Sequence, residues 1–108
     1  MTELLKLMSD ETRLRIFMML YHQDLCVCEL VHLLQESQPK ISKHIAKIRT
    51  LGYVLTSRNE QYIYYSLNRE NPDLMAVLAT IIDSVSKQEP YQNDLKRLQN
   101  MDHFVCGT

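Results

Sequence analysis

Apolar residues recur three or four positions apart over most of the chain, which is the period of an α-helix. A short amphipathic segment over residues 2–8 predicts a small first helix. A second helix is predicted over residues 10–21, with Ser9 or Asp10 placed to cap its start. Its core face is formed by residues at helical spacing, namely Leu14, Phe17, Met18 and Tyr21.

Two more helices are predicted after a polar break at residues 22–24. The third covers about residues 27–35, and its inward face follows the i, i+3, i+4, i+7 pattern: Val27, Leu30, Val31 and Leu34. The fourth starts after Ser37, a good N-cap, and Pro39 falls in its first turn, where a missing N–H costs nothing. Gly52 is placed to end this helix.

The period changes to that of β-strands over residues 53–67, which are rich in β-branched and aromatic residues. A polar pair at residues 59–60 divides this stretch, so it predicts a β-hairpin. The helical pattern then returns over residues 72–88, where Asn71 can cap a helix and Pro72 can start it.

Residues 89–108 form a tail in which residues 91–103 make a weaker amphipathic segment after Pro90. A chain of 108 residues is naturally one domain. We therefore expect residues 1–108 to form a single winged helix–turn–helix domain, mainly α with a β-hairpin wing.

Composition adds little to this picture, but the distribution of charge adds more. The formal net charge is −1, whereas residues 37–59 contain no Asp or Glu and carry Lys40, Lys43, Lys47, Arg49 and Arg58. No apolar run approaches the roughly 20 residues that span a bilayer. The N-terminus lacks the basic start and clean apolar block of a secretory signal, so we expect a cytoplasmic protein without a membrane segment.

The helix–turn–helix over residues 27–51 predicts DNA binding, because its second helix is basic and suits the major groove. Four residues near the start of that helix are placed to reach base edges: Gln38, Lys40, Ser42 and Lys43. Lys47 is better placed for a phosphate, and Arg58 near the hairpin tip for a neighbouring phosphate or the minor groove. The alternative interpretation is an ordinary solvated basic face.

Cys26 and Cys28 lie one residue apart at the start of the third helix. In a reducing compartment we expect free thiols, and the positive end of the helix dipole should lower thiol pKa values there. Thiolates bind soft or borderline ions, and a third ligand is wanted. Cys106 is one candidate, and His32, one turn after Cys28, is a weaker substitute that would suit zinc or cadmium. The alternative is a pair of structural cysteines.

Three segments, LCVCEL, SQPKISKHIAKIRTLGYV and YIYYSL, resemble the ArsR/SmtB family of metal-sensing repressors, particularly its arsenical-resistance branch. The resemblance covers about residues 4–85. It implies a homodimer formed through the first and last helices, with residues 72–88 as the C-terminal dimerisation helix. It also implies a palindromic DNA operator that is released when an inducer binds. The positions matched to family roles are Cys26 and Cys28 as sulfur ligands and Gln38, Lys40, Ser42 and Lys43 facing DNA.

The sequence departs from the family pattern in three places. Val31 stands where the arsenical branch often has a third Cys, so either Cys106 completes the site or two sulfurs suffice, and a two-sulfur site would favour a methylated trivalent arsenical. Residues 73–88 contain no His, so we do not expect the zinc site of the other branch. Glu60 stands where the wing turn usually has Gly, which bears on the wing's contact with DNA.

We therefore expect a homodimeric repressor of a metal(loid)-resistance operon, released from DNA by trivalent arsenic or antimony. One alternative keeps the repressor but has it sense cadmium, lead or zinc, or thiol oxidation or persulfide. Another is a small thiol metal-carrier with no DNA role. We do not expect an enzyme, because the chain has two glycines, no phosphate-binding loop, and no Cys–His or Ser–His arrangement typical of catalysis.

Overall fold

A computed structural model describes residues 1–101 of the chain. Its helices are α1 (Thr2–Met8), α2 (Glu11–His22), α3 (Val27–Leu34), α4 (Gln38–Thr50), α5 (Pro72–Ser86) and α6 (Tyr91–Asn100). Its strands are β1 (Leu25–Cys26), β2 (Val54–Asn59) and β3 (Tyr62–Leu67). The mainly helical architecture with a β-hairpin wing that the sequence predicts is confirmed. Within the described residues, no helix is long and apolar enough to cross a bilayer.

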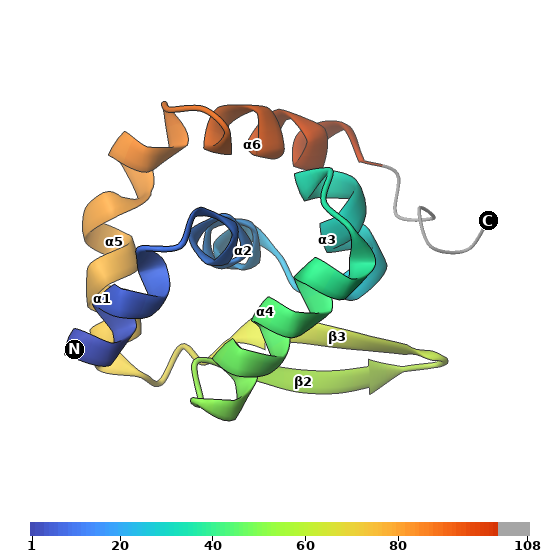
Figure 1. The fold of residues 1–108 in the computed structure, drawn as a ribbon, viewed down its shortest axis with the longest axis horizontal. Coiled ribbons are helices and arrows are strands. Elements are labelled where there is room, and N and C mark those ends of the chain that lie inside the picture. Colours follow the sequence, from blue (N-terminus) through green and yellow to red (C-terminus); the bar gives the residue numbers. More distant parts are fainter. Residues whose placement is uncertain (102–108) are drawn as a thin grey trace.

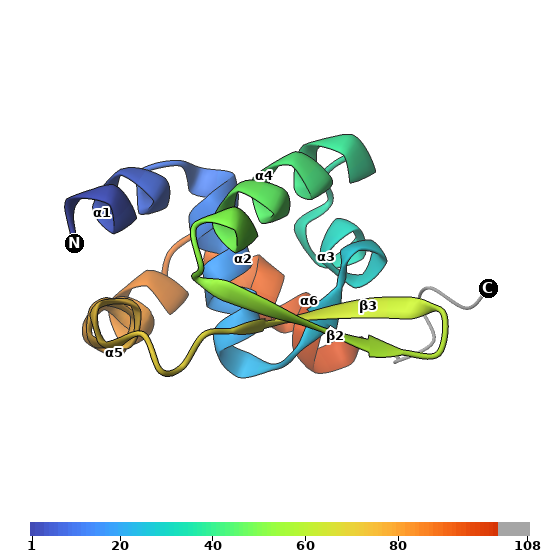
Figure 2. The same ribbon diagram turned by 90° about the horizontal axis from the view of Figure 1, so that it is seen from below.

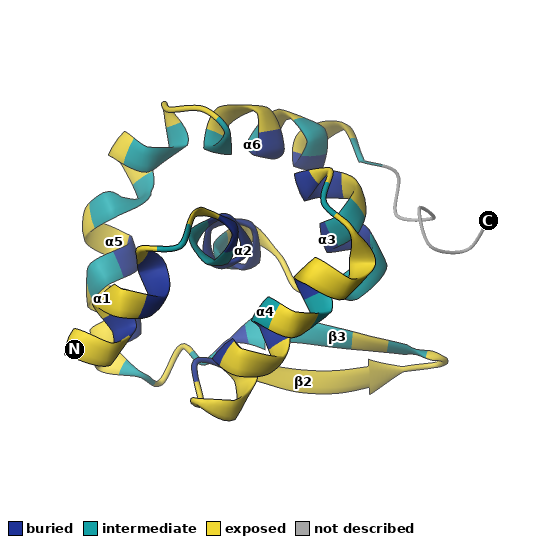
Figure 3. Ribbon diagram, in the orientation of Figure 1, coloured by how far each residue is buried: buried dark blue, intermediate teal, exposed yellow. Residues whose placement is uncertain are grey.

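Helix α2 is the centre of the fold, and the other helices surround it (Figure 1). Its residues from Ile16 to Leu20 are at most 1% exposed, because neighbours pack on more than one side of the helix. The ring of Phe17 meets that of Tyr53 edge to face, with centroids 6.4 Å apart. Burial is concentrated on the faces turned towards α2, and the outer faces are exposed (Figure 3).

Side-chain caps fix the start of three helices. Asp10 accepts a hydrogen bond from Arg13 N at 3.0 Å, Ser37 from Lys40 N at 3.4 Å, and Asn71 from Leu74 N at 3.1 Å. Each cap satisfies a backbone donor that has no partner within the helix. The caps predicted at Ser37 and Asn71 are confirmed, and of the two residues predicted for α2 it is Asp10 that caps.

Gly52 ends α4 in the left-handed conformation, with φ of +85°. The N–H groups of Gly52 and Tyr53 donate to Arg49 O and Ile48 O at 2.9 and 3.2 Å, which is a Schellman arrangement. This turn sends the chain from α4 straight into the wing, so the predicted role of Gly52 is confirmed.

The wing belongs to a three-stranded antiparallel sheet with the order β1-β3-β2. The sequence predicts only the β2–β3 hairpin. Strand β1 was missed because two residues carry no periodicity, and Leu25 and Cys26 pair with Tyr65 and Tyr64 of β3. The hairpin projects beyond the helices below α3 (Figures 1 and 2). The strand before α3 is therefore bonded directly to the wing.

Candidate functional site

Helix α4 presents a polar face to solvent and an apolar face to the core. Ile41, Ile45 and Ile48 are at most 2% exposed, which anchors the helix on the side away from solvent. Of the five α4 residues predicted to contact DNA, Ser42 is half-buried and four are exposed, namely Gln38, Lys40, Lys43 and Lys47. The sequence therefore places the basic residues on the surface, as a groove-reading helix requires.

Several of these side chains have local partners. Gln38 Nε2 donates to Ser42 Oγ at 3.0 Å, so two residues predicted to face DNA bond to each other. Lys40 Nζ pairs with Glu36 Oε2 at 3.2 Å. Such exposed pairs are weak and exchange readily for other partners. Arg58 is exposed in β2, and its Nε donates to Glu60 O at the wing turn at 3.3 Å.

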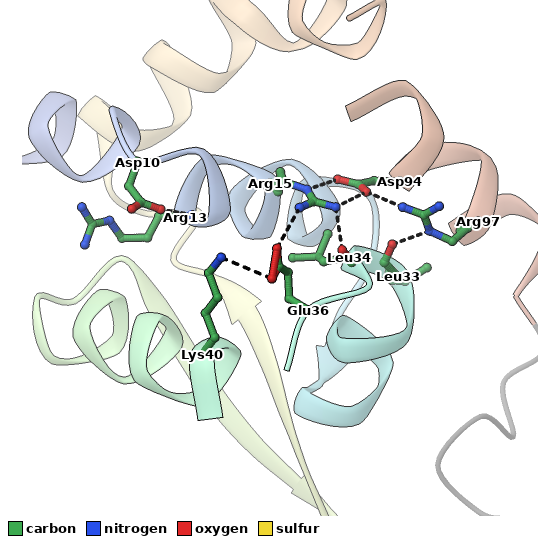
Figure 4. Close-up of polar contacts among 9 residues, drawn as sticks. All are labelled: Asp10, Arg13, Arg15, Leu33, Leu34, Glu36, Lys40, Asp94 and Arg97. Carbon is green, nitrogen blue, oxygen red and sulfur yellow. Dashed lines mark hydrogen bonds and ion pairs between the residues drawn. The ribbon is translucent and has the colours of Figure 1, made fainter. Parts of the chain in front are cut away.

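A buried ion network connects α6 to the turn before α4 (Figure 4). Asp94 is 0% exposed, and its carboxylate accepts two hydrogen bonds of 2.8 Å from Arg15 and one of 2.9 Å from Arg97. Asp94 also raises the pKa of the Arg15 guanidinium through this hydrogen bond and its charge. The same guanidinium donates to Leu34 O at 2.7 Å and lies 3.8 Å from Glu36.

This network fixes the geometry of the helix–turn–helix. Leu34 is the last residue of α3, and its carbonyl would lack a helical partner without Arg15. Glu36, in the turn that follows α3, also forms an ion pair with Lys40. Sequence reasoning missed Asp94 and Arg15. The available signal was an arginine inside the otherwise apolar segment of α2.

The two sulfurs at the start of α3 converge. Cys26 Sγ and Cys28 Sγ are 3.7 Å apart, with Cys26 3% exposed and Cys28 half-buried. Two thiolates at about 2.3 Å from a tetrahedral ion would be about 3.8 Å apart. Cys26 takes an extended backbone as the N-cap of α3, which brings its sulfur towards the next one. The spacing is thus already that of a shared soft ion.

The environment of Cys26 differs from the prediction. Burial raises the pKa of the Cys26 thiol, and the nearby Glu29 carboxylate raises it further, whereas the backbone N–H groups of Glu29 and Cys28 lower it. The expected lowering by the helix N-terminus is therefore wrong for Cys26, because desolvation outweighs the dipole. Glu29 Oε1 accepts from Cys26 N at 3.1 Å, a capping box that its position three residues after Cys26 could have predicted.

The two sulfurs must both be reduced to share an ion, because the thiolate is the form that binds a metal.

An open hollow of about 320 Å³ adjoins the sulfur pair. Its lining comes from the start of α3, the first residue of α4, the wing turn and β3, in particular Cys26, Cys28, Gln38, Gln61, Tyr62 and Ile63. The sulfur pair, the start of α4 and the wing therefore meet around one space. We call this space the thiol hollow.

The predicted third ligands are not part of a described cluster. His32 is exposed in the last turn of α3, and Cys106 lies outside the described residues. Over residues 1–101, no group of three or more His, Cys, Asp or Glu side chains is arranged to hold a metal ion. Within that part of the chain, the structure gathers Cys26 and Cys28 but does not bring His32 to them.

Comparisons with known proteins agree with this geometry. A family model described as "Bacterial regulatory protein, arsR family" matches residues 10–56. The "Arsenic resistance transcriptional regulator ArsR2" of Pseudomonas putida is 41% identical over 101 residues, covering 93% of this chain and 87% of that protein. The "Arsenical resistance operon repressor" of Escherichia coli is 38% identical over 99 residues, covering 89% and 82%. Among solved structures, reduced HlyU from Vibrio cholerae matches with a TM-score of 0.66 at 36% identity, covering 72% of this chain and 80% of that one.

Proposed function

The chain belongs to the arsR family of bacterial regulatory proteins, and from that premise we propose that it is a DNA-binding transcriptional repressor of an arsenical-resistance operon. The observation that carries the proposal is the shared hollow, in which the sulfur pair faces the first residue of α4 and the wing. A repressor acts where the chromosome lies, so the proposal places the protein in the cytoplasm.

DNA reading is assigned to α4 and the wing. The exposed side of α4 enters the major groove, with Gln38 and Ser42 exchanging their mutual hydrogen bond for bonds to base edges. Lys40 leaves its ion pair with Glu36 and contacts the duplex instead. Lys43 and Lys47 face phosphates or bases along the groove. Arg58 on the wing reaches a neighbouring phosphate.

The proposed homodimer forms when a second copy of the chain binds the exposed faces of α1 and α5. Met1 and Leu5 are large apolar side chains that are 54% and 52% exposed. A hollow of about 270 Å³ beside Met1 is lined by Val77 and Ile81 of α5. A homodimer built on this apolar surface presents two α4 helices to a palindromic operator, whose half-sites lie about one turn of DNA apart.

The inducer is assigned to the sulfur pair. Cys26 and Cys28 bind trivalent arsenic or antimony, with Cys106 as the third sulfur of the proposed site and His32 as its weaker substitute. The 3.7 Å separation supports a shared soft ion. Cadmium, lead and zinc are the competing ions, because thiolates also bind them.

Release follows from the position of Cys26 in two elements at once. It is the last residue of β1, which is bonded to β3 of the wing, and it caps α3. An ion bound by Cys26 and Cys28 therefore acts on the wing and on the start of α3 together. The required difference in operator affinity between free and loaded protein is of order 1–3 kcal/mol or more.

The DNA-binding part is tested by selecting duplexes from a random library with the purified protein. We expect a palindrome with half-sites about one helical turn apart, bound by two protomers. Lys43→Glu on α4 should abolish binding to the selected duplex, whereas Lys96→Glu, the same charge change on α6, should keep it. Equal binding by both variants, or no enriched sequence, would refute the proposal.

Redox sensing is a second candidate, favoured by the 3.7 Å separation of the Cys26 and Cys28 sulfurs. A repressor of this kind would leave its operator on treatment with peroxide or polysulfide and rejoin it on reduction. Arsenite added to the fully reduced protein would then have no effect, which separates the two candidates.

A further inference from the structure

A second hollow, of about 480 Å³, lies between α1, α2 and α4, away from the thiol hollow. Its lining includes Glu3, Lys6 and Leu7 of α1, Arg13 of α2, Lys47 of α4, and Leu51 directly after α4. We call it the basic hollow, because three cationic side chains from three different helices converge there with one acid.

The cations of the basic hollow have few internal partners. Lys6, Arg13 and Lys47 take part in none of the ion pairs found among the described residues. Arg13 Nε donates to Leu7 O at 2.9 Å, which holds the side chain in place and leaves its terminal N–H groups for another acceptor. Figure 4 shows Arg13 at the start of α2, separate from the Arg15 network.

The one acid of the hollow is already engaged. Tyr53 Oη donates to Glu3 Oε1 at 3.1 Å. Counting side chains at neutral pH, three positive charges thus face one negative charge, and the surplus favours an anion.

The basic hollow is continuous with the proposed DNA-reading surface. Lys47 follows Lys43 by one turn of α4, and both are exposed. Burial is the main reason that the pKa of His44, between them, is lowered; the charge of Asp10 raises this pKa, and those of Arg13 and Lys43 lower it. Helices α1 and α4 also lie along the same side of the molecule (Figure 2).

We propose that the basic hollow binds a backbone phosphate of the operator through Lys6, Arg13 and Lys47. This inference rests on the proposed function and extends the DNA contact from α4 and the wing to α1 and α2. A helix lying in the major groove has phosphates on both walls of the groove, and the hollow lies at the opposite end of α4 from Gln38. The contact fixes orientation on the duplex and carries no sequence information.

The experiment measures operator affinity against salt concentration for Lys6→Gln and Lys96→Gln, using the duplex selected as above. Both lysines are exposed, and both changes remove one positive charge. The logarithm of the operator association constant falls as the logarithm of salt concentration rises, and each phosphate contact adds about 0.9 to the steepness of this fall. Lys6→Gln removes one contact from each protomer, so it should make the fall less steep by about 2 for a dimer. Lys96→Gln should leave the slope unchanged. Equal slopes for the two variants would overturn the inference.

Glu3→Gln provides a test of opposite sign. The amide still accepts the Tyr53 hydrogen bond, while the negative charge of the basic hollow disappears. Operator binding should become tighter than in the unmodified protein, whereas a purely structural role for Glu3 would make it weaker or leave it unchanged. Thermal unfolding of each variant checks that the fold is retained.

Failure of this inference is distinguishable from failure of the proposed function. If the unmodified protein binds no selected duplex, the proposed function fails. If it binds, and Lys43→Glu abolishes binding while Lys6→Gln behaves as Lys96→Gln, only the basic hollow is refuted. Calorimetry with potassium phosphate in the absence of DNA tests whether the basic hollow binds a free oxyanion instead. Suppose that the protein binds phosphate saturably, that Lys6→Gln loses this binding, and that Lys6→Gln leaves the salt dependence of operator binding unchanged. The hollow would then be assigned to a free oxyanion, and the inference would be overturned.

Discussion

Cys26 lies directly opposite Tyr64 where β1 pairs with β3, so the first cysteine of the thiol pair adjoins the centre of the wing strand β3. The same residue caps α3, whose far end is held by Arg15. A single position therefore connects the proposed inducer site with both parts of the proposed DNA-binding surface.

Removal of the Asp94 carboxylate should destabilise the fold strongly. Asp94→Ala leaves Arg15 buried without its main partner, and loss of one member of a buried pair costs about 3–5 kcal/mol. Lys96→Ala, two residues away and exposed, should change stability by less than about 0.5 kcal/mol. Urea unfolding of both variants measures the difference. A loss below about 1 kcal/mol for Asp94→Ala would show that the network adds little to stability.

Glycine at position 60 should stabilise the wing. Glu60 has φ of +58° in the two-residue turn between β2 and β3, and the left-handed region costs a non-glycine residue about 1–2 kcal/mol. Glycine loses more entropy on folding, so we expect a net gain of about 0.5–1 kcal/mol. Gln61→Gly is the control, since Gln61 does not have positive φ. The midpoint temperature of thermal unfolding should be higher for Glu60→Gly than for the unmodified protein. For Gln61→Gly it should be equal or lower.

Cadmium binding by the reduced protein should tighten as pH rises. Each thiol must lose its proton to bind a divalent ion, which gives about a tenfold gain in affinity per pH unit for each proton released. Because burial and Glu29 raise the pKa of Cys26 above its ordinary 9.0, its proton stays bound in the free protein through pH 8. The rise of cadmium affinity with pH should therefore continue to pH 8. In Cys26→Ser this rise should be smaller by the amount that one released proton contributes. A plateau near pH 7 would contradict the raised pKa.

Neutralising Glu36 should strengthen operator binding. Glu36 holds Lys40 at 3.2 Å in the free protein, and this pair must break if Lys40 is to contact the duplex. Glu36→Gln removes that competition, so we expect a gain of a few-fold in affinity, in keeping with a weak exposed pair. Fluorescence anisotropy with the selected duplex measures it. Weaker binding would mean that Glu36 positions Lys40 productively.

Patterns repeated along the chain predicted most of the fold. The helix faces, the caps at Ser37 and Asn71, the end at Gly52 and the hairpin all depend on local residue order, which a sequence displays directly. Strand β1 escaped prediction because its two residues become a strand only through pairing with β3. The Arg15–Asp94 bond joins residues far apart in the chain, and no local pattern reports such a contact.

The candidate site divides in the same way. The position of Cys26 and Cys28 at the start of the third helix predicted thiols suited to a soft ion, and their sulfurs lie 3.7 Å apart. The sign of the Cys26 pKa shift was not predictable, because it depends on how deeply the fold buries the thiol. The basic hollow likewise exists only once α1, α2 and α4 are packed together.

Titration of the reduced protein on its selected operator with arsenite tests the central claim most directly, with duplex release followed by anisotropy and thiol loading followed in the same samples. We predict that the unmodified protein leaves the duplex as Cys26 and Cys28 are loaded, and that Cys28→Ser binds the duplex normally and stays on it. An operator that remains bound with both thiols loaded, or a Cys28→Ser variant that is released as readily as the unmodified protein, would contradict the account.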